Sequence, residues 1–204
     1  KPEPPEPAKP EPRGLLADGC VLALSFEDRT TDKAEGAIRD ISGNGRKIKK
    51  GRAQFRSTKV GQGLAFDGQG SPATGEGAFL ELPALRVRTV AAWVKKEGTG
   101  PAIWFWGGTN EPDRAFILGF HEAGSFQNWK QRENGVYLGF WQLDVAIPAP
   151  RAHSDWHHYA VSWDGATRVR YAIDGTLMGG AVVAKTGITT EKGRLTLPHV
   201  PKPD

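Results

Sequence analysis

Short apolar runs separated by turn residues recur along most of this chain. Within the runs, large apolar residues tend to alternate with small or polar ones, which is the pattern of strands that bury one face. No segment shows a sustained apolar repeat of 3.6 residues, so no helix longer than a turn or two is expected. The predicted strands are Val21–Phe26, Leu64–Phe66, Ala78–Leu82, Val87–Lys95, Ala102–Trp106, Ala115–His121, Val136–Trp141, Trp156–Trp163, Val169–Asp174 and Arg194–Leu197.

The residues between these runs tolerate the positive φ that tight hairpins require. Asn-Gly or Asp-Gly pairs begin at Asn44, Asp67, Asn134, Asp164 and Asp174. A content of 26 glycines and 15 prolines in 204 residues agrees with many turns and little helix. The chain is therefore predicted to be all-β.

Alternation along the strands sorts the side chains into two faces. The more apolar face is predicted to form the core, where each buried side chain contributes roughly 1.5–3 kcal/mol to stability. Its members are Ile103, Phe105, Phe116, Leu118, Phe120, Val136, Leu138, Phe140, Tyr159, Val161, Trp163, Val169, Tyr171 and Ile173.

The opposite face carries aromatic residues beside glycines, which is the composition of a shallow sugar-binding surface. If its strands share one sheet, Trp104, Trp106, Ile117, Gly119, His121, Tyr137, Gly139 and Trp141 lie together, with His158, Ala160, Ser162, Arg168 and Arg170 beyond them. Trp129, in the loop 124–135, either overhangs this face or anchors its own loop. The structural alternative is that loops cover the indoles and that the glycines ease a bend or bulge.

Three pairs of segments, in this order, carry a family pattern. Leu22–Asp28 is followed by Asp40–Gly45, Gly63–Gly68 precedes Thr89–Lys95, and Trp156–Gly165 leads into Arg170–Gly175. Together they resemble the laminin G-like domains of bacterial multidomain proteins, within the concanavalin A-like lectin and glucanase superfamily. The resemblance implies a two-sheet antiparallel jelly-roll-like β-sandwich over residues 15–197. It also implies that Trp93 and Trp156 occupy core positions.

One departure from the family pattern concerns the C-terminal end. Members usually close with a further strand after the segment that matches Arg194–Leu197, whereas this chain continues into the proline-containing tail 198–204. The closing strand is therefore expected to be absent, which would leave neighbouring strand edges unpaired.

Residues 1–14 form a proline-rich segment in which proline alternates with Glu and Lys. Proline fixes φ and lacks an amide donor, so this segment favours an extended, solvated polyproline II conformation. We interpret it as a spacer that links the domain to other domains or to an anchor. The alternative is a ligand for proline-reading domains.

Net charge and the single cysteine restrict the partners and the compartment. A net charge of +4 permits an anionic glycan without requiring nucleic acid. Seven basic residues and no acid lie between positions 46 and 59, either as a solvated strand with its loops or as a patch for anionic polysaccharide. No apolar run approaches the ~18 residues of a membrane span. Cys20 has no partner for an internal disulfide, and we expect a bacterial extracellular, cell-surface or periplasmic location.

The resemblance also implies a structural calcium ion, which several superfamily members hold near the first strand. Glu27, Asp28, Asp40 and Asn44 stand where its oxygen ligands would come from. The E-x-D-x-x-E triplet of the related laminarinase-type hydrolases is absent, as are the G-x-S-x-G, H-E-x-x-H and phosphate-loop motifs. The chain is therefore not expected to be an enzyme.

These observations predict a non-catalytic carbohydrate-binding module of a larger exported or surface protein, with a polysaccharide or glycan, neutral or anionic, as its partner. The residues expected to contact the sugar are Trp104, Trp106, His121, Tyr137, Trp141, Trp129 and Arg170. The alternative is a protein-interaction or structural spacer domain that binds no glycan.

Overall fold

The computed structural model describes residues 19–20, 22–27, 37–58, 61–66, 73–75, 88–96, 102–107, 115–121, 135–139, 145–148, 155–182 and 194–197. Their secondary structure is β throughout, as the sequence predicts, and contains no helix that could cross a membrane. The strands are β1 (Ala37–Arg39), β2 (Lys47–Lys49), β3 (Gln54–Thr58), β4 (Gly61–Ala65), β5 (Ala73–Gly75), β6 (Arg88–Val94), β7 (Ala102–Gly107), β8 (Ala115–His121), β9 (Gly135–Gly139), β10 (Val145–Pro148), β11 (His157–Trp163), β12 (Arg168–Ile173), β13 (Thr176–Val182) and β14 (Arg194–Leu197).

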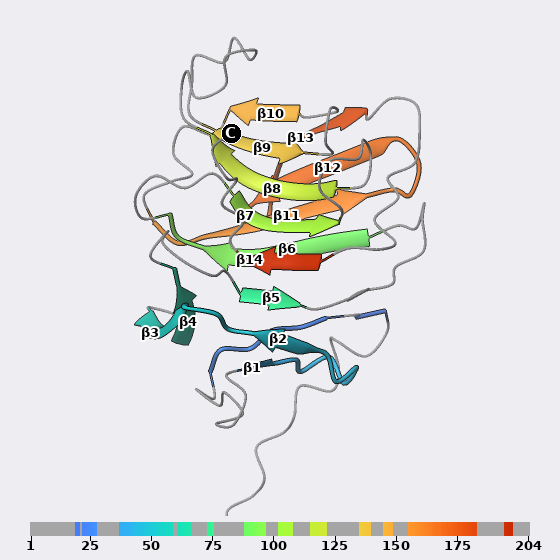
Figure 1. The fold of residues 1–204 in the computed structure, drawn as a ribbon. Helices are drawn as coiled ribbons and strands as arrows, with labels where there is room; N and C mark the ends of the chain where they lie inside the picture. The colour runs from blue at the N-terminus through green and yellow to red at the C-terminus, as the bar shows by residue number, and fades with distance from the viewer. Residues whose placement is uncertain are drawn as a thin grey trace, which may run out of the picture.

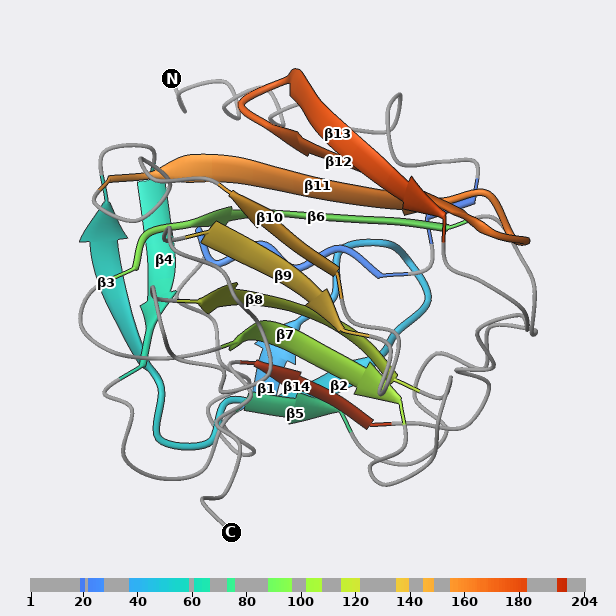
Figure 2. The same cartoon turned by 90° about the horizontal axis from the view of Figure 1, so that it is seen from above.

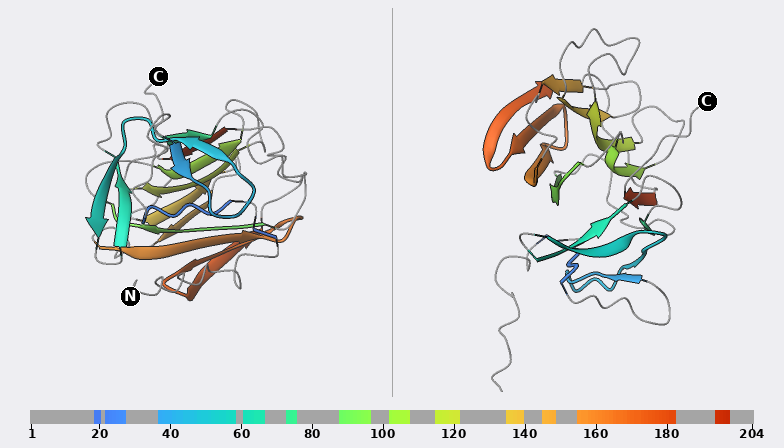
Figure 3. Two further views of the ribbon diagram at one scale, coloured as in Figure 1. Left: turned by 90° about the horizontal axis from the view of Figure 1, so that it is seen from below. Right: turned by 90° about the vertical axis from the view of Figure 1, so that its left-hand side faces the viewer.

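The strands form two antiparallel layers and a separate hairpin (Figure 1). The large sheet has the order β1-β2-β5-β14-β7-β8-β9-β10, and the small sheet has the order β13-β12-β11-β6. Figure 2 shows the small sheet as one layer lying over the large sheet. The β3–β4 hairpin stands at one side of the two layers (Figure 3). This arrangement is the predicted two-sheet sandwich.

The core lies between the two sheets. Tyr159, Val161 and Trp163 alternate along β11 and are at most 1% exposed, as are Val169 and Tyr171 on β12. From the large sheet, Leu118, Phe120 and Val136 are buried against them, and the Phe120 ring meets the Tyr159 ring edge-on at 5.5 Å. All eight residues belong to the predicted core.

Two turns bring β11, β12 and β13 together. Asp174 and Gly175 both have positive φ, 49° and 78°, and the register closes a two-residue hairpin between Ile173 and Thr176. At the other end of the sheet, the Asp164 carboxylate accepts the amide hydrogens of Ala166 and Arg168, each at 2.9 Å. The small sheet therefore depends on two of the predicted turns.

Agreement with the predicted strands is closest where apolar alternation is strong. β8 and β14 have the predicted bounds, β7 and β11 differ from them by one residue at one end, and β6 and β12 differ by one residue at both ends. Within the predicted first strand, only the bridge Leu24–Asp40 forms among the described residues. Ala78–Leu82 lies outside the described residues, as do the segments 1–14 and 198–204.

Strand β13 was not predicted, because its sequence contains two adjacent glycines and no clear alternation. Its pairing with β12 shifts register between Tyr171 and Ala172, and this leaves Met178 as an extra residue. A bulge of this kind breaks the two-residue period on which the prediction relies.

Strand β14 ends the described part of the chain and has neighbours on both sides. It pairs with β5 through Thr196 and Leu197 and with β7 through residues 194–196. The expected unpaired edges next to a missing strand are therefore not found beside β14.

The buried layer gives a first prediction. Replacing Leu118 by alanine should lower the free energy of unfolding by about 2–5 kcal/mol, because the change opens a cavity between the sheets. Leu177→Ala is the matched control, since Leu177 is 63% exposed and its loss should change stability by no more than about 0.5 kcal/mol. Urea unfolding measures both variants, and equal losses would contradict this assignment of the core.

Candidate functional site

The outward face of the small sheet exposes a large aromatic side chain. Trp93 on β6 is 54% exposed, although it belongs to a regular strand in the middle of the chain. His158 on β11 stands directly opposite it in the register. The indole and imidazole centroids are 5.4 Å apart, with an angle of 54° between the ring planes. Together the two rings form a tilted aromatic pair on an accessible surface.

Small residues lie beside this pair. The register aligns Ala91, Ala160 and Ala172 across β6, β11 and β12, on the same face as Trp93. A second row aligns Thr89, Ser162 and Arg170, followed by Gly180 on β13. We call this surface the Trp93 face; it comprises Thr89, Ala91, Trp93, His158, Ala160, Ser162, Arg168, Arg170, Ala172, Leu177 and Gly180, none of which is buried.

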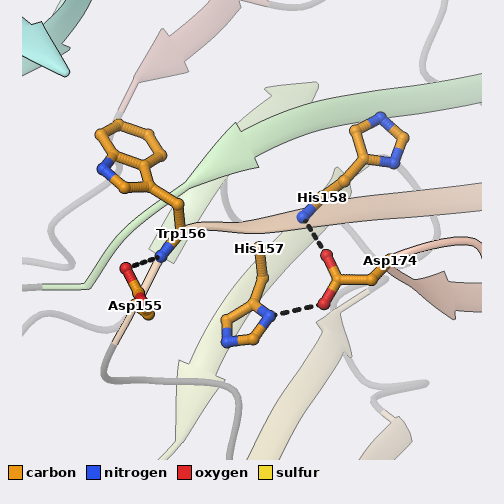
Figure 4. Close-up of polar contacts among 5 residues, drawn as sticks. All are labelled: Asp155, Trp156, His157, His158 and Asp174. Carbon is orange, nitrogen blue, oxygen red and sulfur yellow. Dashed lines mark hydrogen bonds and ion pairs between the residues drawn. The ribbon is translucent and has the colours of Figure 1, made fainter. Parts of the chain in front are cut away.

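Asp174 fixes the end of β11 that carries His158 (Figure 4). Its Oδ1 accepts the backbone amide hydrogen of His158 at 2.8 Å, and its Oδ2 accepts from His157 Nδ1 at 2.6 Å. The Asp174 amide in turn donates to the carbonyl of His158 at 2.8 Å. The hydrogen bond from the His157 side chain, followed by that from the His158 amide, holds the pKa of Asp174 below its ordinary value.

The two histidines point to opposite sides of β11, as alternation along a strand requires (Figure 4). His158 faces Trp93 on the outside, whereas His157 lies on the side of Tyr159, with ring centroids 6.2 Å apart. Because the two rings lie on opposite sides of the strand, they cannot bind one metal ion together.

The small sheet is positively charged on its outward face. Arg168 and Arg170 are exposed there, and β6, β11, β12 and β13 contain no Asp or Glu. Asp164 and Asp174 stand in the turns of the sheet and accept hydrogen bonds from backbone amides, and Asp155, just before β11, accepts one from the Trp156 amide. The Trp93 face therefore combines aromatic, hydroxyl and cationic groups without a carboxylate of its own.

The residues predicted to contact sugar do not assemble as expected. Trp104 and Trp106 lie on β7, His121 on β8 and Tyr137 on β9, which are adjacent strands of the large sheet. Arg170 does not join them, because β12 belongs to the small sheet. The supposition that β7–β9 and β11–β12 share one sheet was wrong. Trp129 and Trp141 lie outside the described residues.

The register also divides the four residues that remain in the large sheet. It places Trp104 opposite Leu118 and Trp106 opposite Phe116, and Leu118 is fully buried. Opposed residues share a face, so the backbone register puts positions 104 and 106 of β7 in line with the buried Leu118, whereas Ile103 and Phe105 were the expected core positions. The pairing of β7 with β8 is irregular between Ala102 and Trp104, so the later residues of β7 are displaced by one position. A displacement of one residue exchanges the two faces of a strand, which explains the difference from the expected alternation.

Positions 121 and 137 stand opposite Gly135 and Gly119, which alternate with the buried Leu118, Phe120 and Val136 along β8 and β9. Both glycines are buried, whereas the corresponding positions of the Trp93 face are not. Among the side chains that the structure describes, an accessible aromatic group on an outward sheet face is found at Trp93 of the small sheet.

Two tryptophans predicted to lie in the core differ from that expectation. Trp93 is exposed, and the alternation of Val90, Ala92 and Val94 on the inner face of β6 accounts for this position. Trp156 is half-buried beside the β3–β4 hairpin, where its indole would come within 3.5 Å of a Cβ added to Gly63. The family resemblance implied burial for both, but in β6 the alternation of the strand places Trp93 on the outer face.

The three described calcium candidates have other partners. Asp40 accepts the amide hydrogens of Ala23, Ser42 and Arg46 at 2.9–3.1 Å. Burial alone would raise the pKa of Asp40, but hydrogen bonds from Ser42, Ala23 and Arg46 outweigh it and leave this pKa below its ordinary value.

The other two candidates do not converge with Asp40 on a single cage. Glu27 accepts from the Gln62 amide, and the Asn44 side-chain amide donates to the Cys20 carbonyl. No group of three metal-binding side chains forms among the described residues, and Asp28 lies outside them. The described donors do not fit a calcium site, and calcium binding stays a prediction.

The amide contacts of Asp40 give a second prediction. Asp40→Ala should lower the free energy of unfolding by roughly 1–3 kcal/mol, because three amides lose a charged acceptor. Glu27→Ala is the matched control, with an expected change within about 0.5 kcal/mol, because it removes one exposed contact. Thermal unfolding compares the two variants, and an equal effect would refute the structural role of Asp40.

Asp174 gives a pH-dependent prediction. Its folded-state pKa is lowered, so its stabilising contribution is present above the ordinary pKa of about 3.9 and is lost as the pH falls through the lowered value. Asp174→Asn keeps a residue that tolerates the turn's positive φ and removes the charge. The stability difference between wild type and Asp174→Asn should therefore disappear under acid. A difference that persists at low pH in urea titrations would contradict this assignment.

Several solved structures resemble this fold. One is domain 4 of AbnA, a GH43 extracellular arabinanase from Geobacillus stearothermophilus, in complex with arabinotriose; the TM-score is 0.58 and the identity 17%, over 87% of this chain and 82% of that chain. A second is the binding domain of Paraclostridial Mosquitocidal Protein 1, with TM-score 0.61 and identity 12%, over 91% and 46% of the two chains. A third is a conserved carbohydrate esterase from the Shiga toxin-encoding bacteriophage phi24B, with TM-score 0.50 and identity 13%, over 86% and 88%.

At these identities the structural likeness shows the fold alone. No curated protein matches the sequence. The laminin G form of the concanavalin A-like lectin/glucanases superfamily matches residues 74–199, which is more than half of the chain. That match includes every strand of the small sheet and therefore the whole Trp93 face. The chain belongs to the concanavalin A-like lectin/glucanases superfamily.

Proposed function

We propose that this domain is a non-catalytic carbohydrate-recognition module and that it binds sugar on the Trp93 face. The observation that carries the proposal is the exposed Trp93–His158 pair on an open sheet. A buried indole contributes to folding, whereas an indole held in a rigid strand and left 54% exposed is available to a ligand.

The chemistry of the face suits a saccharide. Sugar rings have apolar C–H surfaces that stack on aromatic rings, and their hydroxyls need directional polar partners. Trp93 offers the stacking surface, and His158, Thr89 and Ser162 offer polar groups on the same face. The neighbouring alanines leave room for a ring to lie flat. Because the strands are regular, little ordering is required on binding.

The comparisons support this class of function. The superfamily includes lectins and glucanases by its description, and one structure with the same fold was solved with arabinotriose. A retaining or inverting glycosidase needs two carboxyl groups that flank the scissile bond. Among the described residues, the strands of the Trp93 face carry none, so recognition without hydrolysis is the better interpretation of this surface.

The wider context belongs to the same proposal. We place the module in a larger exported or surface protein of bacterial type, with the proline-rich segment 1–14 as the spacer to its other domains. A spacer domain that binds no glycan is the competing function, and the binding experiment decides between them.

Trp93→Ala should abolish glycan binding or weaken it at least about tenfold, because the sugar ring loses its stacking partner. Stacking of a ring on an aromatic side chain is worth about 1–3 kcal/mol. Calorimetric titration with a panel of neutral and acidic oligosaccharides measures the loss. Phe66→Ala is the matched control, since Phe66 is also exposed, at 37%, but lies beyond β4. Circular dichroism verifies that both variants are folded.

The same titration tests the other surfaces. If Tyr137→Ala or His121→Ala removes binding while Trp93→Ala does not, sugar binds on the large sheet and the assignment to the Trp93 face is wrong. If the wild-type chain binds no member of the panel, the spacer function is favoured instead.

A further inference from the structure

We propose that the ligand of the Trp93 face is an acidic oligosaccharide, whose carboxylate or sulfate groups bind Arg170 and Arg168. This inference rests on the proposed function and names its substrate class. It follows from the charge, the spacing and the accessibility of groups on one side of the small sheet.

The charge is concentrated on one face. Along β12, Arg168 and Arg170 are exposed while Val169 and Tyr171 between them are buried. Both guanidinium groups therefore leave the sheet on the side that carries Trp93 and His158. None of the four strands contributes an acid that would neutralise them.

The acids at the turns have other partners. Asp164 directs Oδ1 to the amides of Ala166 and Arg168, and Asp174 binds His157 and the His158 amide. Among the described residues, no ion pair includes Arg168 or Arg170, and the carboxylate of Asp174 pairs with His157 instead. Asp164 lies close enough to Arg168 for the two charges to attract each other. Arg170 has no such partner among the acids of the sheet's turns, so an incoming anion meets its charge directly.

The edge beside Arg170 is open. Gly180 stands opposite it on β13, and a Cβ added there would lie 3.7 Å from Arg170 Cγ and 2.8 Å from the Val169 carbonyl. With glycine at this position, the Arg170 side chain lies beside an exposed backbone instead of beside another side chain. A planar guanidinium with free approach is suited to bidentate binding of carboxylate or sulfate.

The spacing sets the minimum size of the ligand. Trp93 is aligned with His158 and Arg170 with Ser162, so the two sites are two strands apart and four residues apart along the strand. At about 3.3 Å per residue and about 4.8 Å per strand, their Cα atoms are separated by about 16 Å. A single sugar ring is too small to stack on Trp93 and also reach Arg170, whereas an oligosaccharide is long enough.

The experiment uses the full chain and matched pairs of ligands. One pair is an oligogalacturonate and its carboxyl-reduced counterpart of the same length, and the other is a sulfated galactan oligosaccharide and its desulfated form. In calorimetric titrations at low and moderate salt, an acidic member should bind about tenfold or more tightly than its neutral counterpart, and added salt should reduce this preference. Preference for carboxylate or for sulfate identifies the anion, and either supports the proposal.

Arg170→Gln should remove the preference while leaving weaker, Trp93-dependent binding of the neutral form. Arg39→Gln is the control, because it removes the same charge from an exposed position on β1 of the large sheet. An equal loss in both variants would indicate nonspecific attraction to a basic protein and would overturn the inference. Longer acidic oligosaccharides should bind more tightly than the monosaccharide acid.

The outcomes separate this inference from the proposed function. If neutral and acidic forms bind equally and Trp93→Ala abolishes both, the acidic ligand is refuted and the recognition module stands. If acidic forms bind through Arg170 but Trp93→Ala has no effect, anion binding occurs without the aromatic pair, and the proposed sugar platform fails.

Discussion

The structure depends on the packing of one layer of aromatic and aliphatic side chains between the two sheets. The small sheet contributes Tyr159, Trp163 and Tyr171 and the large sheet contributes Leu118 and Phe120, all at most 5% exposed. The Phe120 and Tyr159 rings meet edge-on across this layer. A strand has only two faces, so committing the odd-numbered residues of β11 to the core commits the even-numbered ones to the outside. The Trp93 face is therefore a geometric consequence of how the core is made.

That constraint explains which features could be predicted from the sequence. The strands with clear alternation, such as β8 and β11, were predicted nearly to the residue, and so was the hairpin turn at Asp174-Gly175. The assignment of strands to sheets could not be predicted. Alternation shows which side chains of a strand share a face, but it does not show which strands pair with one another. Arg170 was consequently grouped with residues of the other sheet.

The candidate site shows the same limit on a smaller scale. On β7 a single irregularity after Ala102 shifts the later positions by one residue in the pairing with β8, and no composition rule reveals such a shift in advance. On β6 the phase was readable, since Val90, Ala92 and Val94 form one set and Thr89, Ala91 and Trp93 the other. The core position that the family resemblance implied for Trp93 outweighed that signal, although an exposed large aromatic residue is the more informative observation.

Asp174 links the scaffold to the surface proposed for binding. Its backbone has the left-handed conformation, with φ 49°. This conformation is unfavourable for a residue other than glycine unless local hydrogen bonds of its side chain compensate. Its two carboxylate oxygens meet that condition by accepting from the His158 amide and the His157 ring. The turn that closes β12 onto β13 thereby also fixes the backbone of His158, whose ring stands against Trp93. The Asp174 carboxylate thus stabilises the hairpin turn and also positions the strand that carries His158. A substitution of Asp174 would therefore affect both the turn and the aromatic pair.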